Sequence, residues 1–176
     1  MIFILNQGVS MRFAYSIPLL LLMWILLMGF SAAAAADARF EKNGNGTVLD
    51  TKTGLMWQAQ DSYHELEHGM NWYEALEYVN GKNAEKFAGH NDWRLPSMDE
   101  LNALWDSRRP LASKDGEPIG LPEVFAGGGS YYLWSRDERN LDHAWYFGLG
   151  QSEDYFNLKD LGDLDQGVKL VREVKQ

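Results

Sequence analysis

The chain has 176 residues, a formal net charge of −9 and no cysteine, and 45% of its residues are hydrophobic. This length suits one domain of ordinary size, and the hydrophobic content is too high for a disordered chain. The missing cysteines exclude disulfides, a thiolate zinc site and a cysteine nucleophile, while the acidic charge argues against a nucleic-acid binder, which needs a basic surface.

Residues 1 to 36 have the pattern of a secretory signal peptide. They contain no acidic residue, and Arg12 is their only base, ahead of an apolar run from 17 to 30 and the alanines 32 to 36. A positive start, a short apolar stretch and a small-residue cleavage site predict export with cleavage after Ala36. The run is shorter than the about 20 residues of a membrane-spanning helix, and a membrane anchor is the alternative. Met11 is an alternative start to Met1.

Residues 37 to 176 are predicted to form a single exported domain, in the periplasm or at the cell surface. Membrane contact is expected only through the signal peptide before its cleavage. The domain is predicted to begin with a β-hairpin, in which strands at 47 to 50 and 55 to 58 are joined by a turn at 50 to 54. The preceding Asn-Gly-Asn-Gly at 43 to 46 is similar to a calcium loop. Its asparagines and the missing final acid favour a plain turn.

A helix is predicted from 71 to 80. Asn71 is a good N-cap, and Glu74 three residues later completes a capping box. Apolar residues recur at helical spacing and would form one buried face: Trp72, Ala75, Leu76 and Val79. Gly81 is expected to end the helix. Upstream, His64 and His68 have the spacing of half a metal site, but two solvated histidines are the favoured interpretation.

A short strand at 93 to 95 is expected to lead into a second helix. Ser97 and Glu100 form a complete capping box, and the helix should extend through Trp105. Arg94 can form a bidentate ion pair with Glu100 or another acid. We therefore interpret this block as scaffold rather than as a binding site.

The second half of the domain is predicted to be a long loop followed by strands. Residues 106 to 130 are rich in proline and glycine and should form an excursion with little regular structure. Strands are expected at 131 to 135 and 143 to 147, with 151 to 158 pairing back on the latter. The last strand, 167 to 174, should pair with the first hairpin and close the domain. Helices and antiparallel strands in this order indicate an α+β fold.

Several motifs together resemble a known family. They are Thr-Gly-Leu-Met-Trp at 53 to 57, Trp-Arg-Leu-Pro-Ser-x-x-Glu-Leu at 93 to 101, Tyr-Leu-Trp-Ser at 132 to 135, and Val171-Arg172. Their order resembles the DUF1566 family, also named for the C-terminal domain of the Legionella collagen-like adhesin (Lcl). That family is similar to C-type lectin-like and formylglycine-generating-enzyme-like folds. The resemblance implies two helices around small twisted antiparallel sheets, with paired termini and a long loop region.

The known sites of those folds do not carry over to this chain. Calcium-dependent lectins bind sugar through a Glu-Pro-Asn or Gln-Pro-Asp tripeptide, whereas Glu117-Pro118-Ile119 lacks the third ligand. Asn91-Asp92 has suitable ligand residues but lies well upstream. The formylglycine-generating relatives use active-site cysteines, and this chain has none. No cofactor is therefore expected. Calcium is a weak possibility at the acidic loop of Asp160, Asp163 and Asp165.

The favoured functional hypothesis is a non-catalytic binding module that recognises a neutral glycan or an envelope protein. Aromatic side chains stack on sugar rings and dominate protein interfaces. The resemblance to lectin-like folds implies that the loop-and-strand half carries the ligand contacts. The predicted ligand-binding residues are Tyr131, Trp134, Arg136, Asp137, Trp145 and Tyr146.

Two other classes of function stay open. One is an envelope hydrolase or metal-assisted enzyme, which would use Asp137, Asp142 and His143 and requires them to share one pocket. The other is a structural part of an envelope assembly. Binding of a sulfated polyanion is not expected, because the only adjacent basic pair of the domain is Arg108-Arg109.

Overall fold

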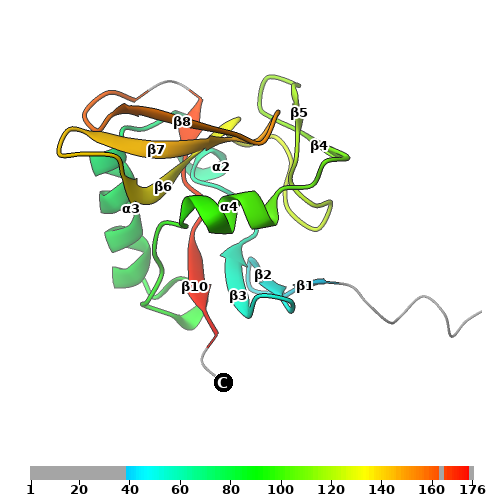
Figure 1. Cartoon of the computed structure of the whole chain (residues 1–176). Helices are drawn as coiled ribbons and strands as arrows, with labels where there is room; N and C mark the ends of the chain where they lie inside the picture. Colours follow the sequence, from blue (N-terminus) through cyan, green and yellow to red (C-terminus); the bar gives the residue numbers. More distant parts are fainter. Residues whose placement is uncertain (1–38, 163–164, 175–176) are drawn as a thin grey trace, which may run out of the picture. The chain divides into compact units, whose positions relative to one another are not determined.

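The computed structural model describes residues 39–162 and 165–174, so the predicted signal peptide and Asp163 lie outside the described residues. Residues Arg39–Gln176 form one compact unit. Its helices and strands follow in the order β1 (Phe40–Lys42), β2 (Thr47–Asp50), β3 (Leu55–Gln58), α2 (Tyr63–Leu66), α3 (Trp72–Ala84), the 3-10 turn η1 (Phe87–Gly89), α4 (Met98–Leu104), β4 (Leu111–Ala112), β5 (Pro118–Ile119), β6 (Tyr132–Glu138), β7 (His143–Gly148), β8 (Glu153–Leu158), β9 (Gln166–Gly167) and β10 (Val171–Glu173) (Figure 1).

The first sheet joins the two ends of the domain. Its strand order is β1-β2-β3-β10, and the predicted hairpin of β2 and β3 is present. The last strand, β10, pairs antiparallel with β3, with Val171 opposite Trp57. The prediction that the C-terminal strand closes the domain on the first hairpin is therefore confirmed.

The second sheet, in the order β8-β7-β6-β9, is covered on both faces. Because side chains alternate along a strand, Leu133 and Phe147 point to one face and Trp134 and Ala144 to the other. The first face packs with α4 and the first sheet in one apolar core. The second face packs with α3 in another. Figure 1 shows α4 between the two sheets.

Both predicted helices are present with their capping boxes. In α3 the Asn71 side chain accepts from Glu74 N, and in α4 the Ser97 side chain accepts from Glu100 N. The prediction that Gly81 ends α3 is wrong, because the helix continues to Ala84. Tertiary contacts of the last turn account for this extension. Asn83 exchanges two hydrogen bonds with the Trp93 backbone, each 2.8 Å.

Two other expectations need correction, and a third holds with one addition. The predicted strand at 93 to 95 is a single bridge between Arg94 and Val171. The predicted last strand is divided between the two sheets as β9 and β10, because the buried residues 168–170 cross the core between them. The loop from 106 to 130 does contain little regular structure, but β4 and β5 form a small hairpin within it.

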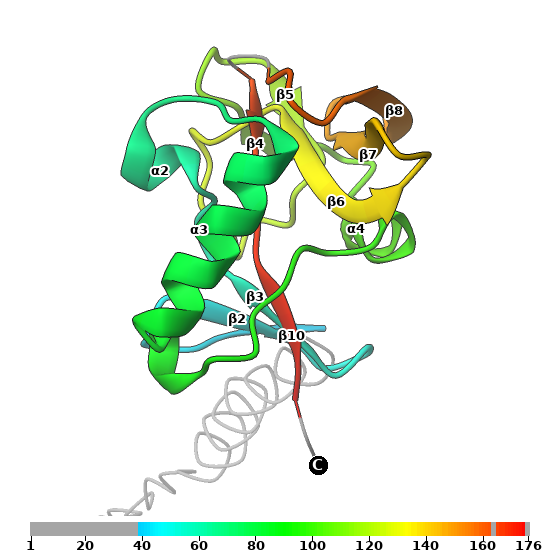
Figure 2. The same cartoon turned by 90° about the vertical axis from the view of Figure 1, so that its left-hand side faces the viewer.

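Several indole rings fill the core, and two of them also donate hydrogen bonds within it. The Trp72 and Trp134 indoles donate to Ser135 O and Met70 O. Such bonds let a large ring be buried with little polar cost. Figure 2 shows α3 running beside β10 and the first sheet. The elements establish an α+β architecture. None of the helices in the described part of the chain is long and apolar enough to cross a membrane.

Candidate functional site

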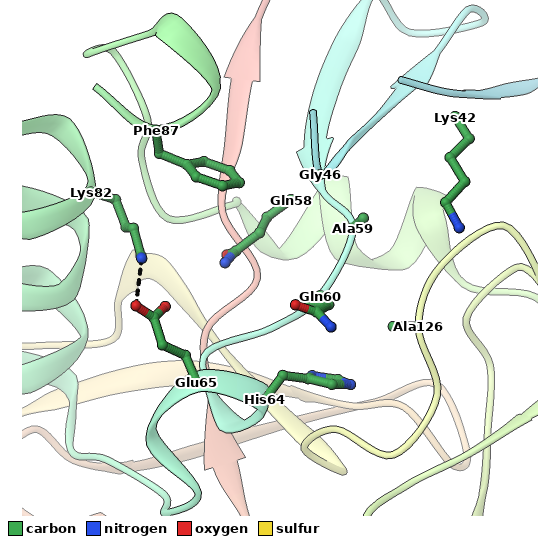
Figure 3. A pocket seen from close by; sticks show the side chains of 10 residues that line it. All are labelled: Lys42, Gly46, Gln58, Ala59, Gln60, His64, Glu65, Lys82, Phe87 and Ala126. Atoms are coloured by element: carbon green, nitrogen blue, oxygen red, sulfur yellow. Dashed lines mark hydrogen bonds and ion pairs between the residues drawn. The ribbon is translucent and has the colours of Figure 1, made fainter. Parts of the chain in front are cut away.

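A cavity of about 460 Å³ opens beside the segment that leaves β3. Six parts of the fold meet at it: the β1–β2 turn, the end of β3, α2, the end of α3, η1 and the loop at Ala126 (Figure 3). Its walls are made by Lys42, Gly46, Gln58, Ala59, Gln60, His64, Glu65, Lys82, Phe87 and Ala126. This volume lies within the range of pockets that hold small molecules, about 300–1,000 Å³.

The Phe87 ring is presented to the cavity by a strained turn. Lys86 and Ala88 on either side of it have positive φ angles of 55° and 53°. Side chains other than glycine rarely adopt this conformation, and such strain gathers at functional sites. The ring is held from behind by Trp93, with ring centroids 5.3 Å apart, and the Trp93 indole donates to Phe87 O. The fold thus fixes one aromatic face at the edge of the cavity.

A chain of polar bonds lines the wall beside this ring, and the Lys82 ammonium at its end lies 5.7 Å from the Phe87 ring centre. Gln58 Nε2 donates to Tyr78 Oη at 2.8 Å, and Tyr78 donates to Glu65. The Lys82 ammonium lies 2.7 Å from the other Glu65 oxygen. The bond from Lys82 holds the pKa of Glu65 below its usual value, and burial raises the pKa of Tyr78. At neutral pH the wall therefore carries an ion pair and two neutral groups.

A buried carboxylate anchors the opposite end. Asp61 accepts from Ser130 N at 2.7 Å and lies 2.8 Å from His64 Nδ1. His64 Nε2 lies 3.0 Å from Gly127 O, so both ring nitrogens face oxygen atoms. Only the doubly protonated ring can donate to both, and the bond to Asp61 accordingly raises the pKa of His64. Figure 3 shows this ring on the side of Ala126.

The glycine-rich loop at 126 to 130 is tied to this anchor. A Cβ on Gly129 would lie 2.2 Å from Asp61 Oδ2, so only glycine allows this approach. Gly128 N donates to Ala112 O, and Gly129 O accepts from Lys114 N. The sequence predicted little regular structure here, and the structure shows an irregular loop that is hydrogen-bonded at successive residues. The lack of a side chain at Gly129 lets the loop backbone lie close to the Asp61 carboxylate.

A fully buried lysine lies beneath the cavity wall. Lys169 Nζ donates to Gln58 O and Ala59 O at 3.2 Å and lies 4.9 Å from the Phe125 ring centre. Burial lowers the pKa of this ammonium to about 8, although the charge of Asp61 opposes the shift. Lys169 thus holds the carbonyls behind the two cavity residues Gln58 and Ala59 in place.

The side chains predicted as a binding face do not share one surface. Trp134 is completely buried, and its ring packs on Tyr146 at 5.3 Å. Trp145 points to the opposite face of the sheet, where it contacts Phe156 at 5.5 Å between ring centres. Because neighbouring residues on a strand point to opposite faces, the predicted aromatic set is divided between two environments.

The remaining predicted binding residues have structural contacts. Tyr131 packs on Tyr132 with ring centres 4.8 Å apart. The Asp137 carboxylate accepts from Met98 N at 2.6 Å and so supports the start of α4. Arg136 N donates to Pro96 O, and its side chain is exposed.

The residues of the enzyme hypothesis are likewise spread out. Asp137 supports α4, and the His143 ring is 3.0 Å from the Asn140 side chain. Asp142 lines a shallow depression whose other lining residues include neither of them. The enzyme hypothesis required these three residues to line one pocket, and the structure does not bring them together in one.

The described residues contain no group of three His, Asp or Glu side chains that could hold a metal ion. The Asp165 carboxylate pairs with Lys114 at 2.7 Å, while Asp160 lines the shallow depression. Asp163, the third residue of the predicted calcium loop, lies outside the described residues, so that loop stays a prediction.

Sequence reasoning did not select the cavity residues. Gln58 directly follows the Thr-Gly-Leu-Met-Trp block, and this position next to a family motif was the available signal for its amide side chain. Phe87 carries no local signal, because its role follows from positive φ angles and from packing on Trp93. The Asp61–His64 pair has helical spacing, yet its loop partners are more than sixty residues away in the chain.

The comparison with protein families identifies the chain. The model of the Lcl C-terminal domain matches residues 46–172, which is most of the chain, and the protein belongs to this family. The resemblance found in the sequence motifs is therefore confirmed. The match includes the β3 block, both long helices and the second sheet. Among curated proteins, none matches the chain.

Proposed function

We propose that this protein is an exported, non-catalytic binding module with a C-type lectin-like fold, and that the cavity recognises a neutral glycan. The observation that carries the proposal is the pairing of the Phe87 ring with amide and carboxylate groups across one small cavity. The apolar face of a sugar ring stacks on an aromatic ring. Its hydroxyl groups both donate and accept, as the Gln and Glu side chains require.

Most charges of the cavity are paired, which supports a neutral ligand, and Lys42 is the lining cation for which the described residues show no ion pair. Glu65 and Lys82 neutralise each other at 2.7 Å, and His64 is paired with Asp61. Among the described residues the exposed Gln60 side chain makes no hydrogen bond that would compete with a ligand. Gln58 uses one amide proton for Tyr78, which leaves the other for a sugar hydroxyl.

Two further arguments favour binding over catalysis. Glycoside hydrolysis uses two carboxyl groups on either side of the scissile bond, whereas Glu65 is the only carboxylate among the lining residues. His64 has an oxygen atom at each ring nitrogen and so lacks a free position for proton transfer. Membership of a family named for an adhesin agrees with a binding role. The export signal in residues 1 to 36 would deliver the domain to the envelope.

A sulfated ligand fits this surface less well. Of the basic pair named above, Arg108 is bonded to Asp106 and Arg109 reaches the carbonyl of Gly150. The net charge of −9 would repel a polyanion elsewhere. We therefore expect no retention on heparin above physiological salt, about 0.15 M.

An array of neutral and sulfated glycans, probed with the full chain, tests the proposal. We expect binding to neutral glycans that resists added salt and falls by about tenfold or more in Phe87→Ala, because the stacking platform is lost. Phe156→Ala is the matched control, since it removes an exposed ring from another surface. Binding of no neutral glycan, or equal binding by Phe87→Ala, would refute the proposal.

A further inference from the structure

Exposed apolar side chains gather at one end of the second sheet. Six large apolar residues in the described part of the chain are exposed. Four of them lie on segments that backbone hydrogen bonds join at this end of the sheet. These four residues, which we call the leucine patch, are Tyr73 (50% exposed), Leu141 (84%), Leu158 (41%) and Leu161 (54%). Single exposed apolar residues are ordinary, whereas a group of them indicates an interaction surface.

The backbone bonds show that these segments are neighbours. Lys159 N donates to Asp142 O, and Leu161 N donates to Leu158 O. Trp72 N, next to Tyr73, donates to Lys159 O. Figure 1 shows the β6–β7 turn beside the segment that follows β8, near α3. The patch is therefore formed by three segments that the fold holds together.

Tyr73 and Leu158 of the patch line a shallow depression with an acidic rim, and Leu141 and Leu161 are each the direct chain neighbour of a rim residue. The depression, of about 190 Å³, is lined by Tyr73, Asp142, Leu158, Lys159 and Asp160. The Lys159 side chain is turned inward, where its ammonium pairs with Glu138 and lies 4.9 Å from the Trp72 ring centre. The positive charge of Lys159 is therefore paired with Glu138. Neither Asp142 nor Asp160 has an ion pair among the described residues, so the rim presents negative charge.

We propose that the leucine patch is a docking site for a protein segment in which apolar residues are flanked by Lys or Arg. Leucine side chains offer a sugar no hydrogen bonds, so the patch differs in chemistry from the cavity. The two rim carboxylates would attract basic residues and repel acidic ones. A second copy of this chain would bring the same acidic rim against itself. An anionic membrane would also be repelled by these carboxylates.

Two synthetic peptides test this proposal with the full chain. Both have a leucine-rich middle, and one is flanked by lysines while the other is flanked by glutamates. Calorimetry should show binding of the basic peptide at least about tenfold tighter than that of the acidic one. The double variant Leu141→Ser and Leu161→Ser should weaken this binding by about tenfold, because the apolar anchors are lost. Both positions are more than half exposed, so folding should not suffer.

Reversal of the rim charge makes the test specific. In the double variant Asp142→Lys and Asp160→Lys, the acidic peptide should become the preferred ligand. Leu66→Ser, an exposed apolar position on α2, and Phe87→Ala, in the cavity, are the controls and should bind the basic peptide as the native chain does.

Four results would overturn the proposal. They are equal binding of both peptides, failure of both to bind, unchanged preference after charge reversal, and unchanged affinity in the leucine variant. Sedimentation of the native chain and flotation with phosphatidylglycerol vesicles are run in parallel. Self-association or vesicle binding that the leucine variant loses, without peptide binding, would assign the patch to a second copy or to a lipid surface instead.

Discussion

Arg94 and Glu100 form a bidentate ion pair across the turn that starts α4, with both N–O distances at 2.8 Å. One Glu100 oxygen also accepts from Ser97 N at 2.8 Å, so the same carboxylate completes the capping box. Arg94 in turn exchanges backbone bonds with Val171 of β10. A single residue, Arg94, thus joins the helix start through its side chain to the strand that closes the domain through its backbone. This supports the interpretation of the Trp-Arg-Leu-Pro-Ser block as scaffold.

Replacement of this carboxylate should destabilise the domain. Burial opposes ionisation of Glu100, but the bonds from Arg94 and Ser97 outweigh it and lower its pKa below 4.5. Glu100→Gln should reduce the free energy of unfolding by about 1–3 kcal/mol at neutral pH, as measured by urea denaturation. A lowered folded-state pKa means that this contribution is lost as pH falls through that pKa. The native chain and the variant should therefore become more alike in acid.

Asp99→Asn is the control for this prediction. Asp99 lies in the same first turn of α4 and interacts there with the helix dipole. It should cost less than about 1 kcal/mol. An equal loss in both variants would show that the ion pair adds nothing beyond the dipole.

Lys169 should give the domain an alkaline dependence of stability. Its pKa is lowered from 10.5 to about 8 in the folded protein. Between these two values the unfolded chain binds more protons, so the contribution of this residue to stability should improve as pH rises. Lys169→Met keeps the volume and removes the titration. The free energy of unfolding of the native chain minus that of the variant should rise from about pH 8 to about pH 10. A flat or falling difference would contradict this account of the buried ammonium.

His64 should make the stability of the domain fall as pH rises, which is the opposite of the effect of Lys169 and occurs at lower pH. Its pKa is raised above 6.5 mainly by the bond to Asp61, against burial and the charge of Lys169. Stability from a raised pKa is complete below the unfolded value and is lost as pH rises through the folded value. Relative to His64→Gln, the native chain should therefore lose stability as pH rises above 6.5 and through the folded-state pKa in urea denaturation. A difference between the two proteins that does not change over this range would show that the Asp61–His64–Gly127 arrangement does not depend on protonation.

Replacement of Trp134 and of Trp145 by alanine should have different effects on stability, although the two residues are only eleven positions apart in the chain. Trp134 is completely buried and donates to Met70 O, so Trp134→Ala should cost about 3–5 kcal/mol of stability. Trp145 is partly exposed beside Phe156, and Trp145→Ala should cost no more than about half as much. Chemical denaturation of both variants measures the contrast. A larger loss in Trp145→Ala would contradict the assignment of the two faces.

The sequence allowed good prediction of local elements but did not point to the cavity residues, for a physical reason. Caps act over three residues, so Asn71 with Glu74 and Ser97 with Glu100 could be recognised directly. The family motifs likewise placed β3 and β10, which the structure pairs as expected. Gly81 led to a wrong prediction of where α3 ends, because contacts made by Lys82 and Asn83 extend the helix beyond it.

The cavity depends on contacts between distant parts of the chain. Phe87 of η1 is held by Trp93 on one side and lines the same cavity as Gln58 of the first sheet, and His64 bonds to Gly127. No spacing rule brings these residues together. The aromatic residues of β6 and β7 attracted attention because of their type. Strand alternation then placed Trp134 in the core and Trp145 on the opposite face.

Nuclear magnetic resonance mapping of sugar binding is the most direct test of the central claim. Neutral disaccharides at millimolar concentration are added to the isotope-labelled full chain, and amide shifts are followed. We predict saturable shifts at the cavity residues Gln58, Gln60, His64 and Phe87, and their loss in Phe87→Ala. Shifts confined to Trp145 and Phe156 on the sheet, or no saturable shifts with any neutral sugar, would contradict the account.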